Sequence, residues 1–212
     1  MKSWKWGAAA LLALMAAACN EPAATTAQEQ QAQPEPAQTL ALTCEAFANL
    51  TGASLTATYG AENITTQTLP GPEGESYTAT VLFPSDPMRT LEIVWADPDA
   101  QLHPASISVS QAASIWIGAH DLSIGDTIAD VEDANGRPFQ LWGFGWDYGG
   151  WVSDWKGGAF APASRCHTRV RFDPRTDPGI GASGDGEFSS NEPAIRAADP
   201  VVSELGVMFG AE

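Results

Sequence analysis

The chain has 212 residues, of which 26 are acidic and 10 basic, so its formal net charge at pH 7 is −16. Removal of the first eighteen residues takes away Lys2 and Lys5 and no acid, which leaves 8 basic residues against 26 acidic ones. Because nucleic acids and anionic lipid surfaces are themselves negative, this charge argues against both as partners. Basic proteins and divalent cations remain compatible with it. The hydrophobic content of 44% is that of an ordinary folded domain with a core.

The first nineteen residues have the pattern of a targeting segment. Lys2 and Lys5 precede an apolar run from residue 7 to 18 that is too short to span a membrane comfortably but fits a secretory signal. The sequence Ala-Ala-Ala-Cys19 resembles the lipobox of bacterial lipoproteins. That resemblance implies cleavage before Cys19, a lipid anchor on this cysteine and, because Asn20 rather than aspartate follows, the outer membrane as destination. Cleavage at an ordinary Ala-x-Ala site is the alternative.

Residues 19–40 are rich in Ala, Gln and Pro and show no apolar periodicity. Such a segment buries too little surface to offset the entropy lost on ordering, so we expect a disordered tether. The sequence therefore predicts a signal peptide over 1–18, a lipidated cysteine with its tether over 19–40, and an α+β domain over 41–212. That domain is expected either as one unit or as two halves that meet near 105–123.

Two cysteines, Cys44 and Cys166, remain near the ends of the folded part. In an oxidising compartment such as the bacterial envelope, two remaining thiols usually pair, so we expect a disulfide between them. Two unpaired buried cysteines are the alternative. Neither cysteine belongs to a CxxC motif, so no metal site is indicated.

In the first half of the domain, a short helix is expected within residues 44–59, ending at Gly60, since glycine commonly follows a helix end. Strands are expected at 77–83, 90–95 and 105–110, where β-branched and aromatic residues lie between Pro- and Gly-rich turns.

In the second half, Asp126 or Thr127 can cap a helix that ends at Asn135-Gly136. Strands are expected at 139–147, 151–155, 167–172 and 201–209, with a long surface loop over 173–186. Alternation places Thr168, Val170 and Phe172 on one face of the third of these strands, and it places Val201, Ser203, Leu205, Val207 and Phe209 on one face of the last.

The element order predicts an α+β fold, an antiparallel sheet with two short helices. Residues 55–60 and 131–136 echo each other, since both end in glycine and both precede strand-like sequence. This echo favours a duplicated helix-plus-strands unit.

The segment Ile124-Gly-Asp-Thr-Ile-Ala-Asp-Val-Glu-Asp-Ala-Asn-Gly-Arg-Pro-Phe139 resembles the helix unit of small envelope lipoproteins of the BamE (SmpA/OmlA) type and of β-lactamase-inhibitor-like domains. The following segment through Gly150 is similar to a recurrent signature of uncharacterised bacterial envelope proteins. The first resemblance implies a helix pair packed on an antiparallel sheet and a function in binding proteins. It carries no site residue over to this chain.

Four of the eight tryptophans lie within residues 142–155. In an extended strand, residues two apart share a face, so Trp142, Phe144, Trp146 and Tyr148 would form an aromatic ladder. Gly149-Gly150 would then turn the chain into a return strand that carries Trp151 and Trp155. The ladder is either a small core or a binding surface. We expect the residues nearest the turn, Tyr148, Trp151 and Trp155, to be exposed.

No catalytic residue, metal ligand or cofactor is indicated, because the histidines form no ligand pattern and no nucleophile motif is present. The leading hypothesis is non-catalytic binding of another envelope protein, as inhibitor or assembly accessory, through Trp146, Asp147, Tyr148, Trp151 and Trp155. Binding of peptidoglycan or another glycan through the same tryptophans is the alternative. A glycoside hydrolase that uses Asp147 and Asp154 is the remote third.

Overall fold

The computed structural model describes residues 38–210, which lie within one compact unit of the chain. The signal segment, Cys19 and all but the last residues of the expected tether lie outside the described residues. Within that tether, Leu40 pairs in a short parallel ladder between β1 (Leu40–Ala41) and β6 (Trp116–Ile117), so the ordered fold begins slightly before residue 41.

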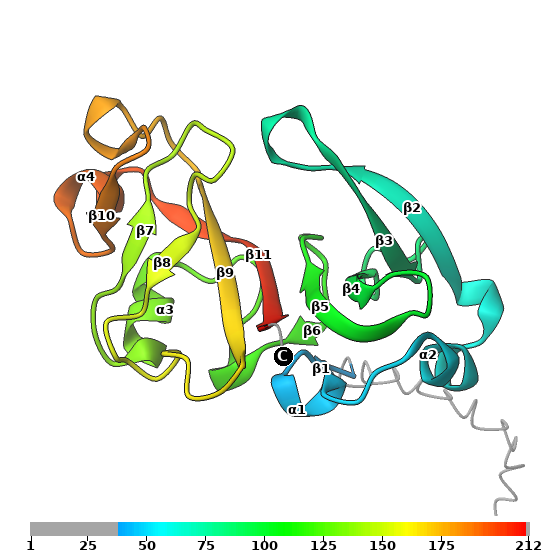
Figure 1. The fold of residues 1–212 in the computed structure, drawn as a ribbon. Helices are drawn as coiled ribbons and strands as arrows, with labels where there is room; N and C mark the ends of the chain where they lie inside the picture. The colour runs from blue at the N-terminus through cyan, green and yellow to red at the C-terminus, as the bar shows by residue number, and fades with distance from the viewer. Residues whose placement is uncertain (1–37, 211–212) are drawn as a thin grey trace, which may run out of the picture. The chain divides into compact units, whose positions relative to one another are not determined.

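Six antiparallel strands form the main sheet, and the expected α+β class is confirmed (Figure 1). Their order across the sheet is β2-β3-β4-β5-β11-β9. The last strand of the chain therefore lies between strands from its first and second halves. The bounds are β2 Ile64–Pro70, β3 Ser76–Leu82, β4 Leu91–Asp97, β5 Leu102–Val109, β9 Cys166–Pro174 and β11 Pro200–Phe209.

The two faces of this sheet differ in chemistry. One face carries buried apolar side chains that alternate along the strands, as in Leu91, Ile93 and Trp95 of β4. Side chains from the helices and from the smaller sheet cover this face, including Phe47, Leu55, Ile128, Val131, Phe139 and Leu141. The opposite face carries polar and charged side chains, which we call the polar face, and it includes Tyr77, Glu92, Ser106, Ser108, Arg169, Arg171 and Glu204.

Two eight-residue helices, α2 (Gly52–Tyr59) and α3 (Ile128–Asn135), begin in the same way. A threonine caps each one, and in both a capping box satisfies backbone donors of the first turn. Each ends at a glycine with positive φ, Gly60 at 82° and Gly136 at 75°. The prediction of a helix within residues 44–59 that ends at Gly60 is thus confirmed by α2. The first turn, α1 (Cys44–Phe47), is separate from it.

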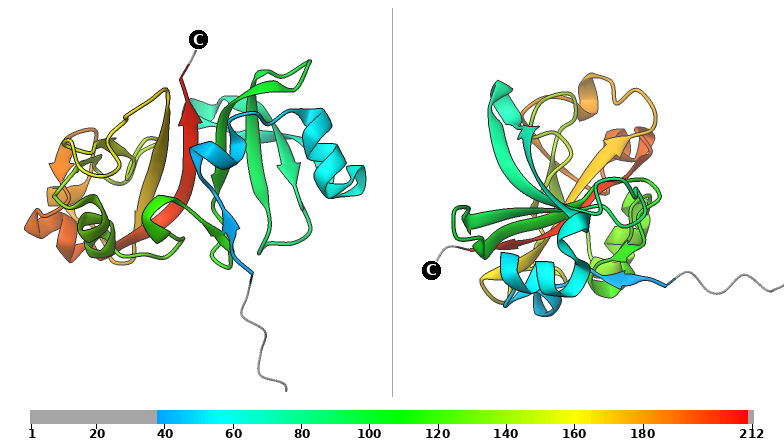
Figure 2. Two further views of the ribbon diagram at one scale, coloured as in Figure 1. Left: turned by 90° about the horizontal axis from the view of Figure 1, so that it is seen from below. Right: turned by 90° about the vertical axis from the view of Figure 1, so that its right-hand side faces the viewer.

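A smaller three-stranded sheet, in the order β10-β7-β8, packs beside the main one and is followed along the chain by α4. In the left view of Figure 2 this sheet and α4 lie at one end of the domain and α2 at the other. The bounds are β7 Gln140–Trp142, β8 Val152–Asp154, β10 Glu187–Ser189 and α4 Pro193–Ala197. Short helical turns lie at Ala61–Asn63, Pro72–Gly74, Ala119–Asp121 and Ile180–Ala182.

Cys44 and Cys166 form the expected disulfide, with their Cα atoms 5.8 Å apart. The bond ties α1 to the first residue of β9 across 122 residues of sequence. Because disulfides persist in oxidising compartments, it indicates an extracytoplasmic location.

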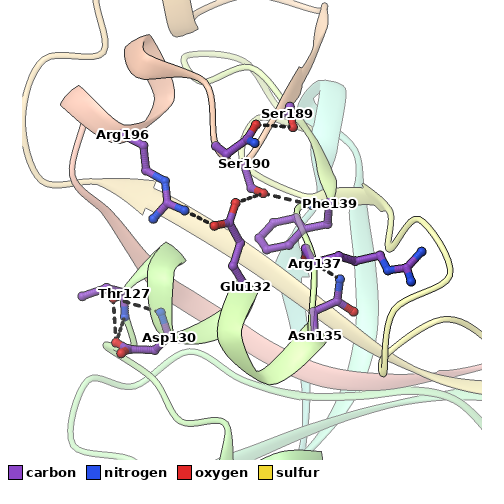
Figure 3. Close-up of polar contacts among 10 residues, drawn as sticks. Thr127, Asp130, Glu132, Asn135, Arg137, Phe139, Ser189, Ser190 and Arg196 are labelled. Carbon is purple, nitrogen blue, oxygen red and sulfur yellow. Dashed lines mark hydrogen bonds and ion pairs between the residues drawn. The ribbon is translucent and has the colours of Figure 1, made fainter.

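A buried polar network joins α3 to α4 and to the end of β10 (Figure 3). Glu132 on α3 accepts hydrogen bonds from the Ser190 hydroxyl and from the Arg196 guanidinium on α4. The Ser190 oxygen in turn accepts from the backbone N–H of Phe139 at 3.0 Å. These contacts fix how the smaller sheet packs against the helices.

Two expectations about strands are wrong in detail. The strand from residue 139 ends at Trp142 rather than at Asp147. In β11, a bulge between Val202 and Glu204 interrupts the alternation, so that Val202, Leu205 and Val207 are the buried residues. The sequence analysis also missed β2, β10 and α4, which fall in polar or proline-containing segments.

We predict that Ser190→Ala lowers the free energy of unfolding by about 1–3 kcal/mol, because it leaves the buried Phe139 N–H without an acceptor. Urea denaturation followed by tryptophan fluorescence measures the change. Ser183→Ala removes an exposed hydroxyl and serves as the control. Equal stability of the two variants would contradict the assigned role of Ser190.

We predict that replacing both Cys44 and Cys166 by serine lowers the free energy of unfolding by about 2–5 kcal/mol, because the open chain gains conformational freedom in its unfolded state. Denaturation of the double variant, compared with the untreated protein and with the protein reduced by dithiothreitol, checks this. A reduced protein as stable as the oxidised one would be inconsistent with it.

Candidate functional site

Three aromatic side chains, Trp142, Trp146 and Tyr148, lie together at the surface, and we call them the aromatic cluster. The ring centroids of Trp142 and Trp146 are 6.1 Å apart and those of Trp146 and Tyr148 are 5.2 Å apart, both in edge-to-face contact. Tyr148 is 38% exposed and the two tryptophans are partly exposed. The cluster is therefore a surface feature held in shape by its own ring contacts.

The expected four-residue ladder is broken at Phe144 and Gly145. Phe144 turns into the core, where it is 2% exposed, and its backbone bonds with Ala182 and Gly184 of the following loop. Gly145 then adopts a φ of +86°, a conformation that favours glycine and redirects the chain. Because Trp146 comes after this redirection, its indole N–H reaches back to the Gly143 carbonyl at 2.9 Å.

The segment returns against β9 through Gly150 and Trp151. Gly150 has a φ of +79°, and a Cβ there would lie 1.9 Å from the Phe172 carbonyl oxygen, so only glycine fits. Trp151 pairs with Arg171 in an isolated bridge. The Arg169 guanidinium lies 3.6 Å from the centre of the Trp151 ring, within reach of a cation–π contact. One face of this indole is therefore occupied by the protein itself.

The expected exposure of Trp155 is wrong. Trp155 is only 5% exposed, and its ring packs between Phe139 and Phe160 with centroids 5.1 and 4.9 Å away. Its carbonyl also accepts a hydrogen bond from Asn135. Phe139 and Asn135 are distant from Trp155 in sequence, and Phe160 follows an irregular turn. The local sequence pattern therefore does not reveal these contacts. Trp155 therefore belongs to the core and lies outside the exposed aromatic cluster.

Asp147 bonds with a distant part of the chain. Its carboxylate accepts a hydrogen bond of 2.7 Å from the backbone N–H of Glu73, 74 residues earlier. Asp154 instead pairs with Lys156 at 2.9 Å. The two acids line different cavities, so the structure does not bring them together as a catalytic pair.

A cavity of about 510 Å³ lies on the polar face of the main sheet, beside the aromatic cluster, and we call it the polar cavity. Trp146, Asp147 and Trp151 line one wall, and Pro70 to Pro72, at the turn after β2, line another. Charged residues from three strands of the sheet complete the lining: Glu92 of β4, Arg169 and Arg171 of β9 and Glu204 of β11. The sequence analysis missed these four residues, because each reads as the solvent-facing half of an alternating strand.

The carboxylates of the polar cavity are held in an unfavourable environment. Burial, and secondarily the nearby Glu204 charge, raises the pKa of Glu92. Burial also raises the pKa of Glu204, although Arg169, Ser108 and Arg171 oppose the shift. Burial lowers the pKa of Arg169, against the influence of Glu204 and Tyr77. Each shift has desolvation as its main cause, so these groups lose water without gaining a full complement of partners.

The described residues, 38–210, contain neither a cluster suited to a metal ion nor a helix suited to span a membrane. No group of three or more His, Cys, Asp and Glu side chains in this range could hold a metal ion. No helix of the described part is long and apolar enough to cross a membrane. No protein family model, curated protein or solved structure matches this chain.

We predict that the protein becomes less stable as the pH rises from about 5 to 7, because Glu92 and Glu204 have folded pKa values above their ordinary value of 4.5. Ionising them costs more in the folded state than in the unfolded state, so the stability they contribute at low pH is lost as the pH rises through the folded values. The aspartates with lowered pKa values, such as Asp86 and Asp199, act in the opposite sense but at lower pH.

Urea denaturation at pH 5, 6 and 7 tests this with Glu204→Gln, which is expected to show a smaller pH dependence than the unaltered protein. Glu62→Gln, at an exposed position, is the matched control. The same pH dependence of stability in Glu204→Gln and in the unaltered protein would contradict a raised pKa of Glu204 in the folded state.

Proposed function

We propose that this domain binds another protein of the cell envelope, without catalysis, through the aromatic cluster of Trp142, Trp146 and Tyr148. The partial exposure of three large aromatic rings in mutual contact carries the proposal. Tryptophan and tyrosine bury much surface with few rotatable bonds, and for this reason they dominate the energetics of protein interfaces. Such a role fits an inhibitor or an assembly accessory.

The charges around the cluster favour a basic partner. Asp147 is exposed between Trp146 and Tyr148, and it binds the backbone of Glu73, which brings that exposed acid nearby. Glu187 pairs with Trp142 across the β10–β7 ladder. An aromatic centre with an acidic rim complements a surface rich in lysine and arginine, and the acidic net charge of the chain would speed the encounter.

Two observations support an envelope location. The N-terminal segment has the pattern of a lipoprotein signal. The Cys44–Cys166 disulfide is of the kind that persists outside the cytoplasm. On this proposal Cys19 carries the lipid anchor and the tether holds the domain away from the membrane surface.

The geometry favours a protein partner over a glycan. A sugar ring stacks on an open, flat aromatic face. In the aromatic cluster, the neighbouring rings meet edge to face, with interplanar angles of 86° and 64°, so no two rings form one flat platform. The Trp151 ring already has Arg169 against one face.

We predict that Trp146→Ala and Tyr148→Ala each weaken partner binding by about thirtyfold or more, corresponding to at least about 2 kcal/mol, as for central residues of interfaces. Photo-crosslinking from position 148 in cells that express the full chain identifies the partner, and titration of the purified pair measures the affinities. Met88→Ala removes an equally exposed apolar side chain elsewhere and is the control.

Partner binding that survives both aromatic substitutions would refute the proposal. Retention of the purified protein on isolated peptidoglycan, lost in Trp146→Ala but not in Met88→Ala, would favour the glycan alternative instead.

A further inference from the structure

The polar cavity has the volume of a small-molecule site. Its volume of about 510 Å³ lies in the range of roughly 300–1,000 Å³ usual for ligand pockets. Its floor is the polar face of the sheet, on the side opposite the core. The hydrogen bond between Asp147 and the Glu73 N–H joins the two turns beside it, one from each half of the chain. This bridge favours a small ligand over a long polymer.

Arg169 contributes a positive charge that lacks a close protein counter-charge. It is partly buried, and its guanidinium lies 3.6 Å from the centre of the Trp151 ring. Among residues 38–210, no carboxylate lies within 4.0 Å of this guanidinium. The guanidinium has five N–H donors, and no buried side-chain nitrogen or oxygen of the described residues lacks a hydrogen-bond partner, so donors of Arg169 that have no protein partner reach the open cavity. A ligand acceptor in the cavity can bind them there.

Glu204 and Glu92 contribute negative charge in the same cavity. The bulge in β11 places Glu204 opposite Arg171 on the polar face rather than in the core. Glu92 lies on β4 and accepts a hydrogen bond of 3.4 Å from the Tyr77 hydroxyl. In the described part of the chain, neither carboxylate has a lysine, arginine or histidine nitrogen within 4.0 Å. The two acids therefore remain available to a cation.

Opposite charges in one cavity that do not pair with each other discriminate against simple ions. A ligand with only a positive charge is attracted by Glu204 and Glu92 but repelled by Arg169 and Arg171. A ligand with only a negative charge is attracted by the two arginines but repelled by the two glutamates. A molecule that carries both charges can satisfy both sets at once, and such an arrangement rejects ligands that lack either charge because a buried group then stays unpaired.

We propose that the polar cavity binds a small zwitterion, a free amino acid or the end of a short peptide, with its carboxylate on Arg169 and its ammonium between Glu204 and Glu92. The Trp146 and Trp151 rings and Val94 supply apolar contact for its carbon atoms. The serine hydroxyls at 106 and 108 and the Tyr77 hydroxyl supply further hydrogen-bonding groups. This site shares Trp146 with the aromatic cluster, but its charged residues take no part in the protein-binding role proposed for that cluster.

Isothermal titration of the purified full chain tests the proposal with the twenty common amino acids, D-alanine and dialanine. For each compound that binds, the amide keeps only the positive charge and the N-acetyl derivative keeps only the negative charge. We expect both derivatives to bind at least about tenfold more weakly than the zwitterion. Equal binding of either derivative, or binding of none of the amino acids and peptides, would overturn the proposal.

Two charge-neutralising variants test which residue binds the carboxylate of the ligand and which binds its ammonium group. Arg169→Gln is expected to weaken binding of the zwitterion and to abolish binding of the N-acetyl derivative. Glu204→Gln is expected to weaken the zwitterion and abolish the amide. Arg175→Gln and Glu62→Gln, which change surface charges outside the cavity, are the matched controls and are expected to bind as the unaltered protein does.

Circular dichroism establishes that each variant is folded. If Arg169→Gln does not fold, the comparison of zwitterion with amide and N-acetyl derivative on the unaltered protein still decides the matter. Substitution of Tyr148, which does not line the polar cavity, is expected to leave zwitterion binding unchanged, and so separates this site from the aromatic cluster.

Discussion

The fold depends on the pairing of β11 with both β5 and β9. This strand is the last of the chain, yet it lies inside the sheet and joins the β2–β5 meander to the second half. Gly206 makes the pairing possible, because a Cβ there would lie 2.4 Å from the Ile107 carbonyl oxygen. Leu205 and Val207 complete the core on one side, while the bulge before them sets Glu204 on the other. The core and the polar cavity thus lie on opposite faces of the sheet that this pairing forms.

The same pairing determines where the aromatic segment can lie. Gly150 packs directly on the Phe172 carbonyl of β9, so the turn that carries Trp146 and Asp147 stands at the edge of the polar face. From there Asp147 reaches the turn after β2. The aromatic cluster outside the cavity and the charged residues inside it are consequently neighbours, with Trp146 part of both. The two surfaces proposed to bind ligands of different chemistry thus both depend on the position of this one turn.

Local sequence patterns predicted those elements whose residues interact with near neighbours. The helix α3 was predicted from its threonine cap and its terminal glycine, and β9 from the alternation of Val170 and Phe172 with two arginines. The disulfide followed from the number of cysteines and the inferred compartment. These features need no knowledge of distant parts of the chain.

The candidate sites depend on distant contacts, and here the sequence was less informative. The aromatic ladder failed because Phe144 bonds with a loop forty residues later and Gly145 takes a positive φ. Trp155 was predicted to be exposed because it lies near the Gly149-Gly150 turn, but Phe139, which precedes β7, and Phe160 pack against its ring. The importance of Glu204 was hidden because alternation marks it only as a solvent-facing residue, while the charged residues that share its cavity come from other strands.

The charged residues of the polar cavity lie where burial disfavours their charged forms, and this loss of stability indicates a function. The chain has 26 acidic residues, and most of those described lie at the surface where water solvates them. Glu92 and Glu204 are exceptions, since burial disfavours their charged forms, and Arg169 is desolvated without a carboxylate close by. Selection for stability alone would pair these groups or replace them with apolar ones. Their presence in one cavity, beside two indoles, distinguishes this face from an ordinary solvent-facing side of a sheet and is the basis for proposing a charged ligand there.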